Sequence, residues 1–143
     1  MRAVAIDLGK VRVGVAISDE LGLLAHPRPF LSGSDTGRLI DQLIALAQEE
    51  NIELFLVGLP RTLKGAKGPP ARRARRFAEK LAERSQLPVE LVDERLTTRE
   101  ASLRLSEQGL NARAQRLRID SAAAAVLLQA WLDARRALAP RAE

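Results

Sequence analysis

The sequence predicts an α/β fold in which a five-stranded mixed sheet carries helices on both faces. Two alternating apolar runs, Ala3–Leu8 and Arg12–Ser18, follow each other closely enough to form a hairpin. A later run, Leu54–Pro60, is continuously apolar, which is typical of a central strand buried on both faces. Apolar residues at helical spacing separate the later strands. This order predicts a three-stranded antiparallel meander followed by two parallel strands.

The remaining elements are predicted from local signals. The run Leu23–Leu31 contains two prolines and suits an edge strand. Ser34–Thr36 are residue types that commonly cap the N-terminus of a helix, and we expect the helix that follows them to end at Asn51. The last predicted strand is Val89–Glu94. Further helices are expected over about 71–85, 97–107 and 119–136, with a basic loop or helix start over 109–118.

Length and composition predict a single domain over residues 1–138 with a short tail at 139–143. There is no cysteine, which excludes disulfides, thiolate zinc sites and cysteine nucleophiles. No apolar stretch approaches the roughly 20 residues of a membrane span, and the chain begins with a predicted strand rather than a signal peptide. We therefore expect a cytoplasmic protein with no membrane partner.

The charge balance points to a polyanionic partner. The net charge is +5 and the isoelectric point is about 10.6. Aromatic residues make up only 3% of the chain and tyrosine is absent, which argues against a stacking platform for single strands. If the partner is nucleic acid, we expect the protein to hold its phosphate backbone.

Three acidic residues lie at the boundaries of apolar elements. Asp7 ends the first predicted strand, Glu94 ends the last one, and Asp120 opens the final helix. A buried, unpaired carboxylate costs several kcal/mol, so a carboxylate at the end of a buried strand indicates a bound partner. If the strands of Asp7 and Glu94 are neighbours, their carboxylates converge at the carboxyl edge of the sheet. Such oxygen ligands suit Mg²⁺ or Mn²⁺, and two ions about 4 Å apart support in-line attack on a phosphodiester.

Each acidic residue also has an ordinary alternative role. Asp7 is placed to cap a turn, and Asp120 is placed to cap its helix. Glu94 is placed to pair with Arg95 at the surface. The neighbouring Asp93 competes with Glu94 for the site, because successive strand residues point to opposite faces.

Two basic clusters accompany these acids. The first, between residues 61 and 84, holds nine cations against two acids, and the second lies just before Asp120. A run of charge is usually a solvated face, but cations beside candidate metal ligands also suit a phosphate backbone. The candidate nucleic-acid contacts are Lys10, Arg12, Arg61, Lys64, Lys67, Arg72, Arg73, Arg76, Arg95, Thr97, Thr98, Arg113, Arg116 and Arg118.

Four segments together resemble the YqgF/RuvX family of ribonuclease-H-like nucleases over essentially the whole chain. They are Ala5–Gly9 with Arg12–Asp19, Val57–Pro60 with Gly65, Asp93–Ala101, and Asp120–Ala124 leading to Leu128–Asp133. The resemblance implies a ribonuclease-H-like sheet and a divalent-metal nuclease site. It assigns Asp7, Glu94 and Asp120 as the catalytic and metal-binding acids. It also implies either maturation of the 5′ end of precursor 16S ribosomal RNA or resolution of Holliday junctions.

The sequence departs from the family pattern in two places. Thr62 and Lys64 stand where the family commonly has Asn and Asp, which makes the loop after Pro60 more basic. One helical turn after Asp120 the chain has Ala123 and Ala124, so a fourth carboxylate like that of related junction resolvases is not evident.

The leading hypothesis is a Mg²⁺- or Mn²⁺-dependent endonuclease acting on structured RNA or branched DNA. Holding the two symmetric strands of a junction would require a homodimer, although no self-complementary surface is visible in the sequence. The missing fourth acid motivates an alternative, a catalytically weak nucleic-acid-binding factor in ribosome assembly or transcription. An actin-like phosphotransferase is a third reading, but that two-domain architecture needs far more than 143 residues.

Overall fold

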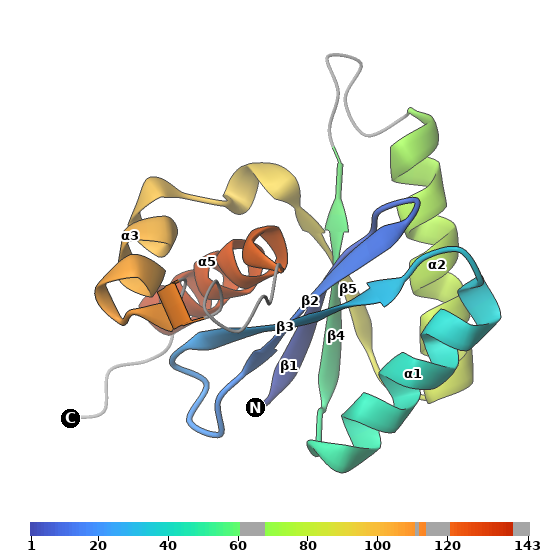
Figure 1. Ribbon diagram of the computed structural model, residues 1–143, viewed down its shortest axis with the longest axis horizontal. Coiled ribbons are helices and arrows are strands. Elements are labelled where there is room, and N and C mark those ends of the chain that lie inside the picture. Colours follow the sequence, from blue (N-terminus) through green and yellow to red (C-terminus); the bar gives the residue numbers. More distant parts are fainter. Residues whose placement is uncertain (61–67, 111, 114–120, 139–143) are drawn as a thin grey trace.

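The computed structural model describes residues 1–60, 68–110, 112–113 and 121–138, which form one five-stranded sheet with helices on both faces (Figure 1). Its strand order is β3-β2-β1-β4-β5. The central β1 pairs antiparallel with β2 and parallel with β4, which confirms the predicted meander and parallel pair. The strands are β1 Ala3–Asp7, β2 Arg12–Ser18, β3 Ala25–Ser32, β4 Leu54–Leu59 and β5 Val89–Asp93.

The helices lie in two layers, with α1 and α2 on one face of the sheet and α3 and α5 on the other (Figure 1). Local signals mark the starts of α1, α2 and α3. Asp35 caps α1 by accepting the Arg38 N–H, two prolines open α2, and Thr98 caps α3. The bounds are α1 Thr36–Glu49, α2 Pro69–Ser85, η1 Glu94–Leu96, α3 Arg99–Glu107 and α5 Ala122–Leu138.

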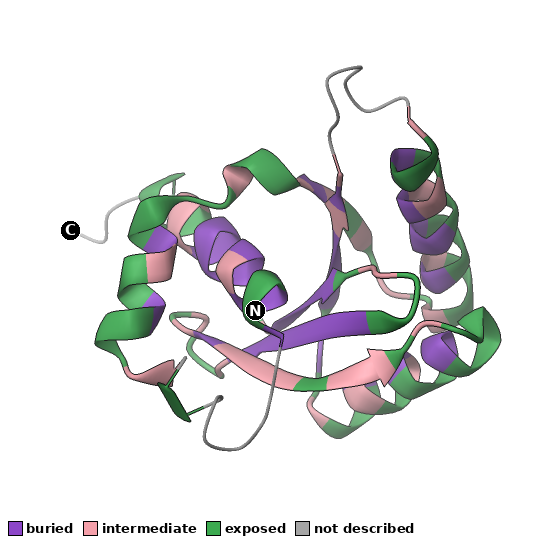
Figure 2. Ribbon diagram, turned by 45° about the horizontal axis from the view of Figure 1, so that its top comes forward, coloured by how far each residue is buried: buried purple, intermediate pink, exposed green. Residues whose placement is uncertain are grey.

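Side-chain alternation along β1 separates two hydrophobic cores. Val4 and Ile6 belong to the core beneath α1 and α2, whereas Ala3 and Ala5 belong to the core beneath α3 and α5. Figure 2 shows this burial along the central strands and the inner faces of the helices. Because small side chains line the second face, α5 packs close to the sheet. Asp7 is the next residue on that same side of β1.

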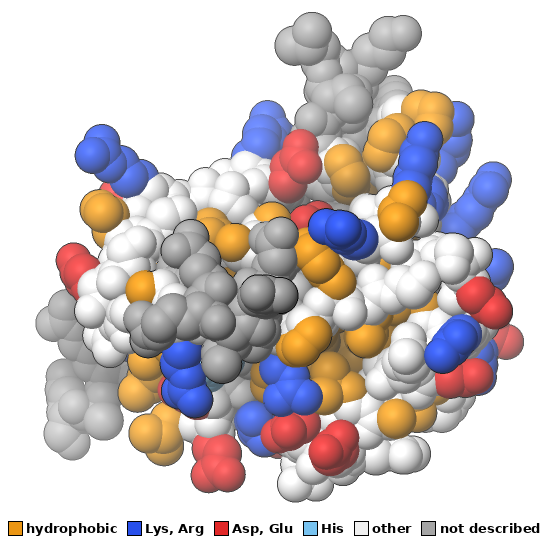
Figure 3. Space-filling view, in the orientation of Figure 1, with side chains coloured by type: hydrophobic (Ala, Val, Ile, Leu, Met, Phe, Trp, Pro, Cys, Tyr) orange, Lys and Arg blue, Asp and Glu red, His pale blue; other side chains and the backbone are white. Residues whose placement is uncertain are grey.

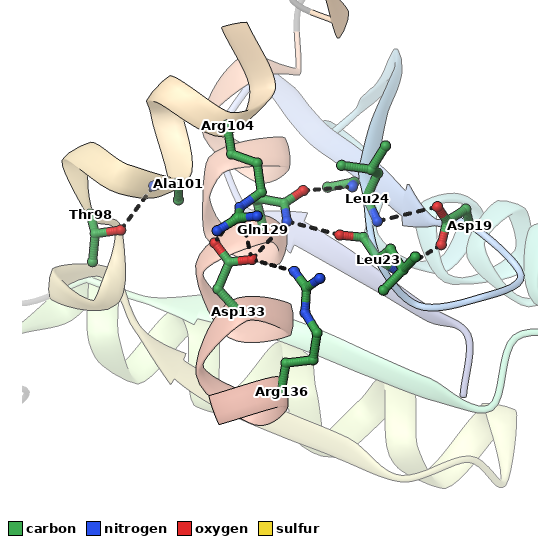
Figure 4. A network of polar contacts seen from close by, with 10 residues as sticks. Asp19, Leu23, Leu24, Thr98, Ala101, Arg104, Gln129, Asp133 and Arg136 are labelled. Carbon is green, nitrogen blue, oxygen red and sulfur yellow. Dashed lines mark hydrogen bonds and ion pairs between the residues drawn. The ribbon is translucent and has the colours of Figure 1, made fainter. Parts of the chain in front are cut away.

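The buried Gln129 on α5 ties this helix to the β2–β3 connection (Figure 4). Its Oε1 accepts the Ala25 N–H at 2.9 Å, and its Nε2 donates to the Leu23 carbonyl at 3.0 Å. The same Nε2 also donates to Asp133, which forms ion pairs with Arg104 of α3 and Arg136. One amide therefore satisfies two backbone groups and holds three elements together.

None of the helices in the described part of the chain has the length and hydrophobicity needed to cross a bilayer.

Replacing Gln129 with Leu should destabilise the protein by about 1–3 kcal/mol, because the buried Ala25 N–H loses its acceptor and the part-buried Leu23 carbonyl loses its donor. Urea unfolding followed by circular dichroism measures this change. Gln48→Leu, at an exposed position on α1, is the matched control and should change stability by less than about 0.5 kcal/mol. Equal effects of the two substitutions would refute the role assigned to Gln129.

Candidate functional site

Asp7 and Glu94 meet in one open pocket at the carboxyl edge of the sheet. The strands β1, β4 and β5 run parallel, so β1 and β5 both end at this edge, separated by β4. Asp7 is the last residue of β1, and Glu94 follows directly after β5. The pocket has a volume of about 520 Å³ and is also lined by Pro60, Thr97 and Ala123. The predicted convergence of these two carboxylates is therefore present in the fold.

The Asp7 carboxylate lies in an environment that disfavours its charge. The residue keeps contact with solvent, but the surrounding protein removes part of its hydration. This partial desolvation raises the pKa of Asp7 above its ordinary value, and the negative charge of Glu94 raises the pKa further. Within the described residues, the Asp7 carboxylate accepts no hydrogen bond, so the structure does not support the turn cap. A cation between the two acids would relieve both effects.

The end of β5 distinguishes the roles of the two neighbouring acids. Asp93 accepts the Arg95 N–H at 2.9 Å and forms an ion pair with the Arg95 guanidinium at 3.3 Å. The surface partner of Arg95 is thus Asp93, and Glu94 is the acid that lines the pocket. The 3-10 turn accounts for this arrangement, because the strand ends at Asp93 and the backbone then changes direction. The sequence predicted a strand through Glu94, one residue too long.

Thr97 and Thr98, both expected to contact nucleic acid, use their hydroxyls inside the protein. The Thr97 hydroxyl donates to the Glu94 carbonyl oxygen at 2.8 Å, which braces the turn that carries Glu94. The Thr98 hydroxyl accepts the Ala101 N–H at 3.1 Å as the cap of α3. Both hydroxyls therefore have partners within the protein, and the contact of these exposed threonines with nucleic acid stays a prediction.

Ser121 positions the start of α5 against the sheet, and sequence reasoning did not single it out. Its hydroxyl accepts the Val15 N–H at 3.0 Å, and the residue is 2% exposed. The register between β2 and β3 shifts between Val13 and Val15, so this N–H lies at an irregular point of the ladder. The only sequence signal was a small polar residue directly before an alanine-rich helix.

The other residues predicted to contact nucleic acid lie at separate places on the protein. Lys10 and Arg12 are exposed beside the β1–β2 turn, and the Arg12 guanidinium lies 5.5 Å from the centre of the Phe30 ring. Arg113 is exposed, and Arg95 lines the acidic pocket. A second pocket is lined by Arg72, Arg73 and Arg76. Outside the described residues lie Asp120, Arg61, Lys64, Lys67, Arg116, Arg118, the motif residue Gly65 and the predicted tail 139–143.

The residues that the structure describes contain no group of three or more acidic or histidine side chains placed to hold a metal. They do contain the pair formed by Asp7 and Glu94, whose oxygen atoms match the preference of Mg²⁺ and Mn²⁺. The unfavourable charge of this pair, with Asp7 raised in pKa by its neighbour, fits a site for a divalent cation.

The comparisons with known proteins agree with this geometry. A family model described as "RuvX: Holliday junction resolvase" matches residues 1–134. A protein of Anaeromyxobacter sp. (strain Fw109-5), named "Putative pre-16S rRNA nuclease", is 44% identical over 137 residues, covering 96% of this chain and 100% of that protein. A protein of the same name from Mycobacterium ulcerans (strain Agy99) is 46% identical over 139 residues, covering 96% and 82%.

Solved structures of junction resolvases share the fold. RuvC of T. thermophilus in complex with a Holliday junction substrate has a TM-score of 0.60 at 17% identity, covering 95% of this chain and 96% of that one. The fowlpox virus resolvase with its Holliday junction DNA has a TM-score of 0.57 at 12% identity, covering 94% and 99%. These similarities confirm the expected ribonuclease-H-like fold.

Asp7→Asn should raise the melting temperature of the metal-free protein at neutral pH. A raised pKa means that ionised Asp7 destabilises the folded state, a cost that is present above the folded-state pKa. The cost disappears as the pH falls below the ordinary carboxyl pKa of about 4, so the gap between variant and wild type should shrink there. Thermal melts in a chelator across this pH range measure the gap. Glu53→Gln, at an exposed position, is the control. A variant less stable than wild type at neutral pH would contradict this assignment.

Ser121→Ala should destabilise the protein by about 1–3 kcal/mol, because the buried Val15 N–H loses its acceptor. Ser106→Ala, at an exposed position on α3, is the matched control and should have almost no effect. Chemical denaturation compares the two variants. Hydrogen exchange at Val15 supplies a local readout, since this amide should lose protection in Ser121→Ala alone. Unchanged protection would show that Ser121 does not anchor β2.

Proposed function

The chain belongs to the RuvX family, and from this premise we propose that it is a divalent-metal-dependent endonuclease that cleaves structured nucleic acid. The observation that carries the proposal is the meeting of Asp7 and Glu94 in one pocket at the carboxyl edge of the sheet. Ligands bind at this edge in open α/β sheets. Arg95 in the pocket and the exposed Lys10 and Arg12 of the β1–β2 turn carry positive charge that a phosphate backbone requires.

In this proposal Asp7, Glu94 and Asp120 are the metal ligands. The Asp7 carboxylate, at the end of the central strand, would bind the cations together with the carboxylates of Glu94 and Asp120. Bound Mg²⁺ or Mn²⁺ would supply an activated water and neutralise charge at the scissile phosphate. Support for Asp120 comes from its neighbours in the chain, since Ser121 is anchored to β2 and Ala123 lines the pocket.

The protein's own residues then hold and orient the reactants. The Thr97 hydroxyl keeps the Glu94 turn in place, and the partial desolvation around Asp7 strengthens its attraction for a cation. Arg95 lines the pocket and forms an ion pair with Asp93, so its charge lies beside the site. We propose that cleavage leaves a 5′-phosphate and a 3′-hydroxyl.

We favour precursor 16S ribosomal RNA as the substrate. Relatives that are 44–46% identical over nearly the whole chain carry the name of a pre-16S rRNA nuclease, whereas the resolvases seen with junctions are only 12–17% identical. A four-way DNA junction is the competing substrate, and its symmetry would require a homodimer. The RNA role agrees with the cytoplasmic location that we expect for the protein.

One observation favours a second candidate, a nucleic-acid-binding factor with little catalytic power. Ala123, three residues after Asp120 in the sequence, lines the acidic pocket, where a fourth carboxylate would strengthen metal binding. Such a factor would bind nucleic acid with a steep salt dependence and would not cleave it with any divalent ion.

Asp7→Asn and Glu94→Gln should each lower the cleavage rate by roughly a thousandfold or more, because each removes a ligand charge needed in the transition state. Cleavage of precursor 16S RNA and of a four-way DNA junction is measured with Mg²⁺ and with Mn²⁺. Asp93→Asn is the matched control. Its amide oxygen can still accept the Arg95 N–H, so we expect activity within about threefold of wild type.

The outcomes separate the candidates. Full activity of Asp7→Asn would exclude the metal-ligand role, and a large loss in Asp93→Asn alone would move that role from Glu94 to Asp93. Cleavage of the junction but not of the RNA would reverse the substrate assignment. Tight, salt-sensitive binding without cleavage by the wild-type protein would establish the binding factor instead.

A further inference from the structure

A second pocket, of about 400 Å³, lies between α2 and the start of α1, on the face of the sheet opposite α5. Its floor is apolar, formed in part by Leu8, Leu39 and Phe77. Its rim carries four cations of α2, and the lining residues that the structure describes include no acidic side chain. These cations are Arg72, Arg73, Arg76 and Lys80.

Helical spacing gathers these charges at one place. Arg72, Arg76 and Lys80 follow one another at intervals of four residues, which places them on one face of α2. Figure 3 shows Lys and Arg side chains projecting from the side of the molecule that α2 forms. Like charges held together over an apolar floor repel one another, and an anion in the pocket relieves that repulsion. Planar guanidinium groups match the geometry of phosphate oxygens.

This pocket and the acidic site lie on the two sides of the same strand end. Asp7 lines the acidic pocket and the next residue, Leu8, lines the basic pocket, because successive residues at the end of β1 point to opposite faces. Between the two pockets runs the β1–β2 turn, which carries the exposed Lys10.

A hydrogen bond connects the basic pocket to that turn. Arg73 lines the pocket and donates from Nη2 to the Gly9 carbonyl oxygen at 2.7 Å, two residues after Asp7. Gly33 contacts the same β1–β2 turn, because its N–H donates to the Val11 carbonyl oxygen at 2.8 Å. A Cβ atom at Gly33 would lie 2.8 Å from the Gly9 carbonyl oxygen, so only glycine permits this approach. The guanidinium has five N–H donors, and most remain for a ligand.

Resting on the proposed nuclease function, we propose that this pocket binds a backbone phosphate of the substrate outside the scissile linkage. Arg72, Arg76 and Lys80 contact the phosphate oxygens. Arg73 contacts the phosphate and the Gly9 carbonyl together and is a positioning residue, because it steadies the turn that follows Asp7. Occupation of the basic pocket therefore supports the geometry of the acidic site on the other side of the sheet.

The test compares Arg76→Ala, which removes a pocket cation, with Arg75→Ala, which removes a cation from the same helix outside the pocket. Binding of the substrate is measured by fluorescence anisotropy in a chelator, so that no cleavage occurs. Arg76→Ala should weaken binding about tenfold and lower the slope of log affinity against log salt by about 0.7–0.9. Arg75→Ala should change both quantities much less. Equal effects would show that only the overall charge of α2 matters.

Neutral methylphosphonate linkages, placed one at a time along the substrate, identify the phosphate. One position outside the scissile linkage should weaken binding of the wild-type protein and have no further effect on Arg76→Ala. Additive effects at every position would overturn the proposal. Thermal melts with inorganic phosphate test a free ligand. Suppose that inorganic phosphate raises the melting temperature of the wild-type protein but not of Arg76→Ala, and that no methylphosphonate linkage weakens substrate binding. The pocket would then be a site for free phosphate, which would also overturn the proposal.

Kinetics test the positioning role of Arg73. Arg76→Ala should raise KM with kcat nearly unchanged, whereas Arg73→Ala should raise KM and also lower kcat at least fivefold. A change in KM alone for Arg73→Ala would show that the Gly9 contact does not support the acidic site. These binding results are independent of cleavage. If one methylphosphonate linkage weakens binding but the protein cleaves no substrate, the phosphate pocket is supported and the proposed nuclease function is refuted. If the protein cleaves its substrate but no single linkage weakens binding, the nuclease function is supported and the phosphate pocket is refuted.

Discussion

The close packing of α5 on the sheet is the constraint on which the rest of the structure depends. It is possible because one face of the central strands is lined by alanine, including Ala3, Ala5 and Ala16, opposite Ala124 and Ala125 of the helix. Larger side chains at these positions would hold the helix away from the sheet. The distance between α5 and the sheet in turn decides how near Ala123 lies to the carboxylates of Asp7 and Glu94.

Two polar side chains complete this packing at places where apolar contacts cannot. Ser121 accepts a backbone N–H at the irregular part of β2, and Gln129 satisfies two backbone groups of the β2–β3 connection. Hydrogen bonds of buried polar groups are directional, whereas apolar packing tolerates sliding. The two residues therefore set the position of α5 along the sheet, and with it the start of the helix beside the acidic pocket.

Two pockets of opposite charge lie on the two sides of the end of β1. The end of β1 directs Asp7 to an acidic pocket suited to a cation and Leu8 to a basic pocket suited to an anion. A scissile phosphate can approach the carboxylates only when cations lie between them, and the basic pocket is proposed to hold a different phosphate of the same substrate. The turn held by Arg73 and Gly33 connects the two environments. The charge pattern thus follows from the fold as much as from composition.

The five strands, their mixed pairing, the two helical layers and the placement of Asp7 and Glu94 at strand ends were all predictable from the amino-acid sequence. They were predictable because hydrophobic periodicity and turn chemistry are local properties of the chain. Only the tertiary structure decided that Glu94 rather than Asp93 lines the pocket, since this depends on a 3-10 turn that ends β5 one residue early. Only the tertiary structure showed that Thr97 and Thr98 serve the protein internally, that Ser121 anchors α5, and that the α2 cations share a pocket with Leu8. The Ser121 contact and the pocket shared by Leu8 and α2 join residues far apart in the chain, which no local pattern encodes. The Thr97 and Thr98 hydrogen bonds span only three residues, and a threonine before a helix is a local capping signal.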